Sequence, residues 1–172
     1  MGMKDMKVYN LIFPIWFLLF FPPVIFFTLL GNYVIDSLVV IVSFYLFKQA
    51  KHQLNVKRFY KKSILKVWLF GFLADIIGAA IIFVFGMSGF LFGLSNELMS
   101  AICYDPFSHP VAVLIICAAM LVSALLIFFF NYACTFKRLI ENKKERIKVA
   151  LTIAIITIPW TFLLPTKWFY EG

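Results

Sequence analysis

Long runs of apolar residues occupy most of this 172-residue chain and leave little that can form a water-soluble surface. Hydrophobic residues make up 63% of the sequence and charged residues only 14%, and the mean hydropathy is +0.97. A soluble domain is about half apolar and about a quarter charged. Because a helix needs about 20 apolar residues to cross the hydrocarbon core of a bilayer, the sequence predicts an all-α polytopic membrane helix bundle.

Five segments are apolar enough to be drawn as spans of a single integral membrane domain. They cover about residues 8–30, 33–47, 64–85, 111–136 and 149–164. The basic segments 48–62 and 137–148 connect spans at one side, and the outer loop 87–110 connects them at the other.

The first two spans are nearly continuous, so the chain must turn back between them. Gly31-Asn32 is the favoured turn because it leaves the first span a workable length, and Pro22-Pro23 is the alternative. In the favoured arrangement the two prolines kink or break the first span, because proline lacks a backbone donor and restricts the residue before it.

The basic residues predict the orientation. In the five-span arrangement 15 of the 16 Lys and Arg residues fall on one side, and only Lys167 lies opposite. Cytoplasmic loops carry an excess of Lys and Arg, so the N-terminus is predicted inside and the C-terminus outside. The abundance of Lys and the lack of an Asn-X-Ser/Thr sequon favour a bacterial inner membrane.

The net charge of +8 belongs to the ends of the apolar runs, and no basic face is formed, which argues against nucleic acid as a partner. Anionic lipid headgroups are the expected partners, since each basic residue near the surface contributes about 1 kcal/mol. Homo-oligomerisation or binding to another membrane protein stays open.

Two aspartates, Asp36 and Asp75, stand inside apolar runs. An ionised side chain there costs about 2.5–3.5 kcal/mol. Each lies 12 residues from the predicted inner boundary, which corresponds to about 18 Å of helix. Gly71, Gly78 and Ala79 share a helical face with Asp75 and predict close contact with another helix. The two carboxylates are therefore predicted at similar depth on adjacent antiparallel spans.

Four other polar residues are candidates to support this pair. Asn32 and Ser43 form a weak polar stripe with Asp36 at helical spacing. Ser123 and Asn131 lie in the fourth predicted span, where hydrogen bonds across helices are favoured over a pore-lining role.

The aspartates give the leading functional hypothesis. Two close carboxylates without an intramembrane Lys or Arg are not expected to ionise together, so they share a proton, bind a cation or receive a positively charged substrate. The sequence therefore predicts a transport-type protein, self-assembled or an accessory subunit, with its ion or substrate site at Asp36 and Asp75. The alternative is an interaction or assembly protein in which each protonated aspartate only fixes helix packing.

A membrane enzyme is the third hypothesis. Glu97, Cys103, Asp105 and His109 share the outer loop, but their spacing matches no metal signature. The sequence contains no nucleophile elbow, P-loop, HExxH or Gly-rich nucleotide motif. No catalytic residue, metal or cofactor is therefore predicted, and the chain is not expected to be an enzyme.

Overall fold

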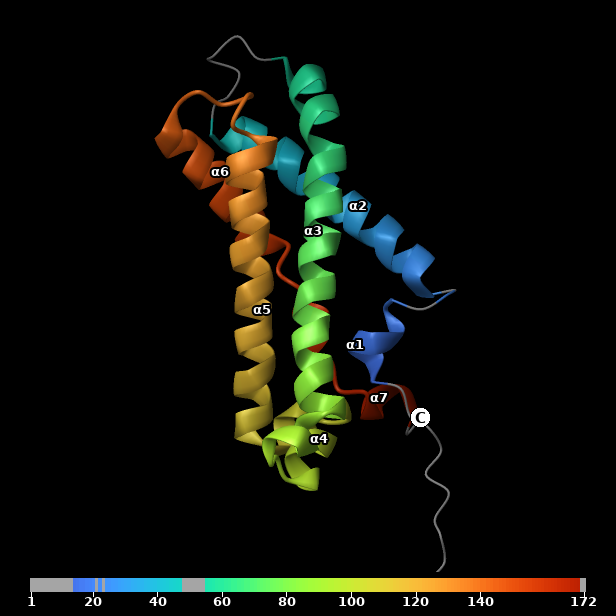
Figure 1. Cartoon of the computed structure of the whole chain (residues 1–172). Coiled ribbons are helices and arrows are strands. Elements are labelled where there is room, and N and C mark those ends of the chain that lie inside the picture. Colours follow the sequence, from blue (N-terminus) through green and yellow to red (C-terminus); the bar gives the residue numbers. More distant parts are fainter. Residues whose placement is uncertain (1–13, 21, 23, 48–54, 171–172) are drawn as a thin grey trace, which may run out of the picture.

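The computed structural model describes residues 14–20, 22, 24–47 and 55–170, which form helices and turns with no strand among them (Figure 1). Four segments in this part of the chain are long and apolar enough to cross a membrane. They are α2 (Val24–Leu46), α3 (Val56–Met87), Pro110–Thr135 and Lys143–Leu163. The prediction of an all-α chain with membrane-length helices is confirmed.

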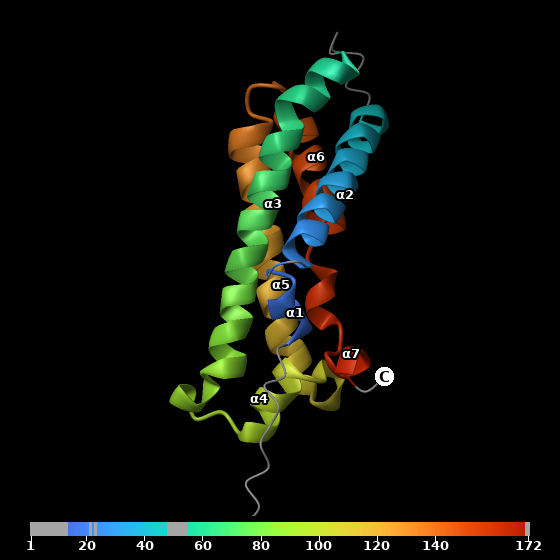
Figure 2. The same ribbon diagram turned by 90° about the vertical axis from the view of Figure 1, so that its right-hand side faces the viewer.

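Shorter helices and turns complete the fold. In chain order they and the two remaining long helices are α1 (Ile15–Leu18), η2 (Gly89–Phe92), α4 (Asn96–Cys103), η3 (Pro106–Ser108), α5 (Pro110–Phe130), η4 (Asn131–Thr135), α6 (Lys143–Ile156), η5 (Trp160–Leu163) and α7 (Lys167–Tyr170). Helices α3 and α5 run side by side along the whole bundle (Figures 1 and 2). The bundle has two further columns, and each is interrupted. One consists of α1 and α2, and the other consists of α6, η5 and α7 (Figure 2).

Asparagine side chains begin two of the long helices. Asn55 precedes α3 and Asn142 precedes α6, and each side-chain oxygen accepts a hydrogen bond of 2.9 Å from the backbone N–H two residues later. An N-cap of this kind satisfies a donor that the first helical turn leaves free. Pro159 follows the end of α6 closely and prevents its continuation, because proline cannot supply the next backbone donor.

The turn predicted at Gly31-Asn32 is wrong, because α2 passes through both residues without interruption. The break lies earlier, where residues 19, 20 and 22 form turns between α1 and α2. This is the alternative position at Pro22-Pro23, of which Pro23 lies outside the described residues. A glycine inside a helix costs only about 1 kcal/mol, whereas a proline costs about 3 kcal/mol.

As a consequence, predicted spans 8–30 and 33–47 do not form a hairpin within the described residues. Trp16 of α1 packs in one core with residues of α4. Phe44 of α2 packs in a separate core with Phe59 and Phe136, near the basic segments. Residues 14–46 therefore run in one direction along the bundle, and the start of span 8–30 lies outside the described part.

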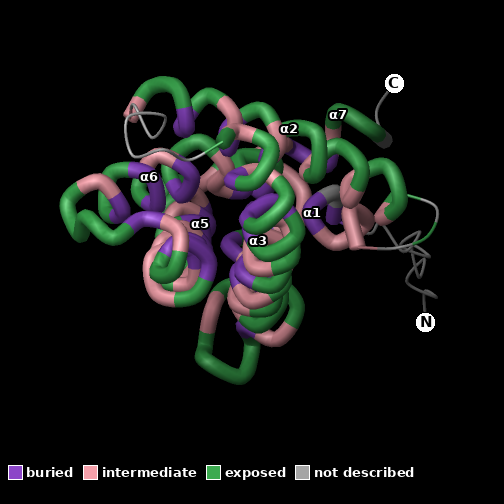
Figure 3. The backbone as a smooth tube through the Cα atoms, turned by 90° about the horizontal axis from the view of Figure 1, so that it is seen from above, coloured by how far each residue is buried: buried purple, intermediate pink, exposed green. Residues whose placement is uncertain are grey.

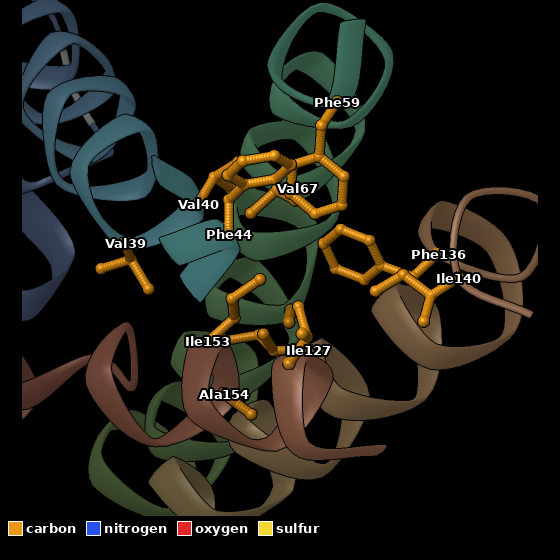
Figure 4. Close-up of a cluster of buried hydrophobic side chains, with 12 residues drawn as sticks. Val39, Val40, Phe44, Phe59, Val67, Ile127, Phe136, Ile140, Ile153 and Ala154 are labelled. Atoms are coloured by element: carbon orange, nitrogen blue, oxygen red, sulfur yellow. The ribbon is translucent and has the colours of Figure 1, made fainter. Parts of the chain in front are cut away.

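The interior consists of two apolar cores, one at each end of the bundle. The first core surrounds the stacked rings of Phe59 and Phe136, whose centroids are 5.6 Å apart (Figure 4). The second core joins α1, α4 and η5 to the lower halves of α3 and α5 through Trp16, Ile102 and Phe162.

The outer surface of the helices is also apolar. Buried positions face the interior of the bundle and exposed positions cover its outside (Figure 3). Among the exposed side chains are Phe26, Leu65, Leu114 and Leu125. A soluble monomer rarely exposes so much contiguous apolar surface, so this outer face fits hydrocarbon and not water.

The sequence assigns Arg146 to the basic inner loop 137–148, but its side chain is buried in the structure. The guanidinium carbon lies 4.4 Å from the centre of the Tyr132 ring, and Nη2 donates a hydrogen bond of 3.2 Å to the Tyr132 hydroxyl. Arg146 therefore fastens the start of α6 to the end of the α5–η4 helix, a cation–π contact that sequence spacing does not reveal.

The C-terminal segment is fastened to the end of the bundle opposite the basic segments. Thr166 Oγ1 donates a hydrogen bond of 2.8 Å to the Cys103 carbonyl oxygen, and Lys167 Nζ lies 2.5 Å from Asp105 Oδ2. The Lys167 backbone N–H also donates to the Tyr104 carbonyl oxygen at 3.2 Å. These contacts hold the start of α7 against the end of α4 and the two residues between α4 and η3.

We expect the double substitution Thr166→Val and Lys167→Met to loosen this attachment. Removing one hydrogen bond and one ion pair should lower the local opening free energy by about 1–2 kcal/mol, which makes amide exchange about 5–30 times faster. Hydrogen exchange of residues 160–170 in detergent micelles measures this, with the exposed Trp168→Phe as control. Unchanged exchange in the double variant would contradict the attachment.

Candidate functional site

A cavity of about 520 Å³ lies where the two interrupted columns face α3. Its lining residues come from the turns at 19–20, from the first half of α2, from residues 71–75 of α3 and from residues 156–162. The chain leaves regular helix on two sides of this cavity, after α1 and after α6. Both breaks therefore border the cavity.

Asp36 and Asp75 both line this cavity, one from α2 and one from α3. Asp36 is only 5% exposed, and its Oδ2 lies 3.8 Å from the place where a Cβ on Gly71 would stand. Gly71 is one helical turn before Asp75, so the Asp36 carboxylate rests against α3 one helical turn from Asp75. The structure thus brings together the two residues that the sequence singles out.

Neither carboxylate has a partner among the described residues. Asp75 Oδ1 is buried and accepts no hydrogen bond from any described group. The ion pair found in this part of the chain, Lys167 with Asp105, lies at the end of the bundle. Buried polar groups in proteins are nearly always hydrogen-bonded, so an unpartnered carboxylate oxygen beside a cavity indicates a site awaiting a ligand or proton.

The pair lies between the two apolar cores. Ala74, directly before Asp75, belongs to the first core, and Ala79, one turn later, belongs to the second. Asp36 lies one turn before Val39 of the first core. The carboxylates therefore stand partway along the bundle and not at either end.

Of the four supporting polar residues, Asn32 alone lines the cavity. Ser123 Oγ donates a hydrogen bond of 3.0 Å across the helix interface to the Ala74 carbonyl oxygen. Asn131 Nδ2 donates to the Ile127 carbonyl oxygen in its own helix at 2.9 Å, and Ser43 is buried outside the lining. Ser123 and Asn131 thus act in packing, which is the interpretation that the sequence favours, although Asn131 does not bond across helices.

Sequence reasoning missed the contribution of residues 156–162. The sequence predicts span 149–164 as continuous, but α6 ends at Ile156 and its C-cap, Thr157, lies at the cavity. The last carbonyl groups of a helix carry a partial negative charge. The detectable feature is Pro159, which restricts residue 158 and excludes an uninterrupted helix.

The outer-loop candidates do not gather into one site. No group of three His, Cys, Asp or Glu side chains that can hold a metal ion occurs among the described residues. His109 Nδ1 accepts a hydrogen bond from the Val111 N–H at the start of α5, and Asp105 pairs with Lys167. Glu97 is exposed in the first turn of α4.

Burial raises the pKa of the Cys103 thiol to about 11. Since the thiolate is the nucleophile, we expect alkylation of Cys103 near pH 8 to be about 200 times slower than for an ordinary thiol with a pKa of about 8.5. The rate should keep rising beyond pH 10. Mass spectrometry after N-ethylmaleimide treatment measures it, with SDS-unfolded protein as control. A rate that levels off near pH 9 would contradict this.

These features define a small all-helical protein with membrane-length helices and an acidic cavity between two interrupted columns. No family model, curated protein or solved structure matches the chain.

Proposed function

We propose that this chain is a small transport-type membrane protein in which Asp36 and Asp75 bind a proton or a cation. The observation that carries the proposal is the pair of carboxylates in one cavity at the breaks of two helical columns, with Asp75 Oδ1 buried and unpartnered among the described residues. Ionisable residues inside membrane spans are costly and mark ion or substrate pathways.

The broken helices support this function independently of the charges. Irregular backbone at membrane depth is tolerated only where it is buried in protein or lines a cavity. Transporters bind ions and substrates where discontinuous helices end near the middle of the bilayer. Here the C-terminal end of α6 lines the same cavity as the carboxylates, and its partial negative charge favours a cation there.

The charge balance of the cavity favours a positive ligand. No Lys or Arg occurs among the described lining residues. A buried carboxylate needs a positive partner, a proton or several hydrogen bonds. Because the chain supplies no positive side chain within the described lining, a proton or an external cation is the group that completes the site.

Reconstitution into liposomes tests the function. Proton flux is followed with an internal pH dye, and sodium or rubidium uptake is followed with radioactive tracers. We expect flux above that of empty liposomes for the wild type, and at least a tenfold loss for Asp36→Asn combined with Asp75→Asn. Asp105→Asn, which changes an acidic residue outside the cavity, is the matched control. Flux equal to empty liposomes in the wild type would reject the proposal.

The proposed orientation places the basic segments in the cytoplasm of a bacterial inner membrane, following the excess of Lys and Arg. Four crossings would then put residue 14 outside, on the side of residues 104–109, whereas the five-span arrangement predicts the N-terminus inside. The inside position depends on Lys4 and Lys7, which lie outside the described residues.

We expect an impermeant maleimide to label Lys4→Cys and Ser108→Cys in intact cells, and Glu141→Cys only after permeabilisation. The experiment uses a background in which the three native cysteines are replaced by serine. Protection of Lys4→Cys would support the inside N-terminus of the five-span arrangement and contradict the four-crossing arrangement.

The competing hypothesis is an assembly protein whose aspartates only fix packing. Such an aspartate needs a hydrogen-bond partner across a helix interface. Ser123 meets that requirement through the Ala74 carbonyl oxygen, whereas Asp75 Oδ1 does not meet it with any described group. The transport-type function is therefore preferred.

A further inference from the structure

The cavity is much larger than a bare ion requires. Inorganic cations are held by about six oxygen ligands at about 2.0–2.6 Å, which leaves almost no free volume. A volume of about 520 Å³ is instead typical of sites for small organic molecules, which range over about 300–1,000 Å³. The size of the cavity therefore indicates an organic ligand.

Five aromatic residues contribute to the walls of the cavity. The aromatic lining residues are Phe20, Phe27, Phe72, Trp160 and Phe162. Aromatic faces pack against apolar groups and attract cations through the ring quadrupole, at about 0.5–2 kcal/mol for each contact. A wall of this kind combined with two carboxylates suits a ligand that is both apolar and positively charged.

Two of the three threonine hydroxyl groups on the lining, those of Thr28 and Thr157, also favour a positive ligand. Thr28 Oγ1 donates to the Val24 carbonyl oxygen at 3.1 Å, and Thr157 Oγ1 donates to the Ile153 carbonyl oxygen at 2.9 Å. Each hydroxyl proton is therefore used within its own helix, and its lone pairs remain as acceptors. A cation matches such a surface, whereas an anion would find few donors.

The rim of the cavity faces the apolar outside of the bundle. Phe27 on α2 is 74% exposed and Trp160 on η5 is 60% exposed, yet both line the cavity. Helices α2 and α6 pack together at the first core, through Val40 and Ile153. Beyond that contact, the wall of the cavity is formed by the irregular segment that begins at Thr157. The mouth therefore opens toward hydrocarbon.

We infer that the cavity binds a lipophilic organic cation that enters sideways from the bilayer. Its charged group lies beside Asp36 and Asp75, and its apolar groups lie against the aromatic wall. This inference rests on the proposed function, because it names the substrate class of the same carboxylate site.

Tetraphenylphosphonium binding to the purified full chain in mild detergent tests the inference. Tetraphenylborate, an anion of the same size and shape, is the matched probe, and tetramethylammonium is a small cation without the apolar groups. By equilibrium dialysis we expect saturable binding of tetraphenylphosphonium only, reduced at least tenfold in Asp36→Asn and in Asp75→Asn. Asp105→Asn should bind like the wild type.

Fluorescence gives a second measurement that does not depend on the aspartate variants. Trp160 lines the cavity, so tetraphenylphosphonium should change the indole emission of the wild type and change that of Trp160→Phe much less. Equal changes in both proteins would overturn the assignment of the ligand to this cavity.

The outcomes separate this inference from the proposed function. Absence of saturable tetraphenylphosphonium binding, or equal affinity for tetraphenylborate, overturns the inference even where carboxylate-dependent proton or sodium flux persists. Carboxylate-dependent binding of tetraphenylphosphonium without any flux supports the ligand class and rejects transport.

Discussion

Replacing Asp75 with leucine is expected to stabilise the empty protein and to abolish binding at the cavity. Asp75 Oδ1 is buried without a hydrogen-bond partner among the described residues, and the side chain borders a cavity with room for a larger group. An unsatisfied buried polar group costs about 1–3 kcal/mol. For a chain of this size, removing that cost should raise the melting temperature by about 3–10 °C.

Ser123→Ala is the contrasting variant, because it removes a polar group that has a partner. Ser123 Oγ donates to the Ala74 carbonyl oxygen one residue before Asp75. Its loss should destabilise the bundle by about 1 kcal/mol. Thermal unfolding in one detergent compares both variants. If Asp75→Leu lowers the melting temperature as Ser123→Ala does, the result supports the assembly hypothesis, in which the aspartate only fixes packing.

A variant that gains stability and loses binding is expected when the replaced residue belongs to a binding site. Binding sites retain groups that are unfavourable in the empty protein, and their removal commonly exchanges activity for stability. A carboxyl group kept only for packing is instead expected to stabilise the bundle through its contacts. The sign of the stability change at Asp75 therefore distinguishes the two hypotheses without knowledge of the ligand.

Counting residues along the helices predicts a similar depth for the two aspartates, because the rise per residue is constant. The prediction takes both as equally far from the basic segment, whereas Asp36 lies 10 residues before the end of α2 and Asp75 lies 19 residues after the start of α3. Both residues line one cavity. The all-α class follows equally directly, because hydropathy alone reports long apolar helices.

The breaks are harder to predict because hydropathy does not report helix continuity. Segment 149–164 is apolar throughout, and yet α6 ends at Ile156. Gly31-Asn32 resembles a turn, and yet α2 continues through it. Both breaks lie near prolines, at Pro22-Pro23 and at Pro159. That the two breaks meet at one cavity is a tertiary relation, which no local pattern contains.

Partners of individual polar side chains are also beyond the reach of the sequence. Ser123 and Asn131 lie in the same column, but Ser123 bonds to another helix and Asn131 bonds to its own. Arg146 resembles its basic neighbours and is nevertheless buried on Tyr132. Such differences depend on the rotation and spacing of neighbouring helices, which hydropathy and charge do not encode.

Alanine substitutions at two glycines should have opposite effects on stability. A Cβ on Gly78 of α3 would stand 2.1 Å from Ser123 Oγ and 3.0 Å from a ring carbon of Phe162. Overpacking of this kind costs about 1–3 kcal/mol, and the Ser123 hydrogen bond is lost as well. We expect Gly78→Ala to lower the free energy of unfolding by about 2–4 kcal/mol.

Gly31→Ala is the matched control within α2, where an added Cβ meets nothing within 4 Å. Alanine favours a helix over glycine by about 1 kcal/mol, so this variant should be neutral or more stable. A loss of stability at Gly31 would contradict the continuous helix and restore the predicted turn.

The cause of the Gly78 effect can be isolated, because the atom closest to the added Cβ is a single hydroxyl oxygen. Ser123→Ala removes that oxygen, so Gly78→Ala should cost less in the Ser123→Ala background than in the wild type. The coupling expected for contacting residues is about 0.5–3 kcal/mol. Strictly additive effects would mean that the Phe162 ring of η5 at 3.0 Å, and not Ser123, resists the added Cβ. Thermal or SDS-induced unfolding of the four proteins of this cycle supplies the measurement.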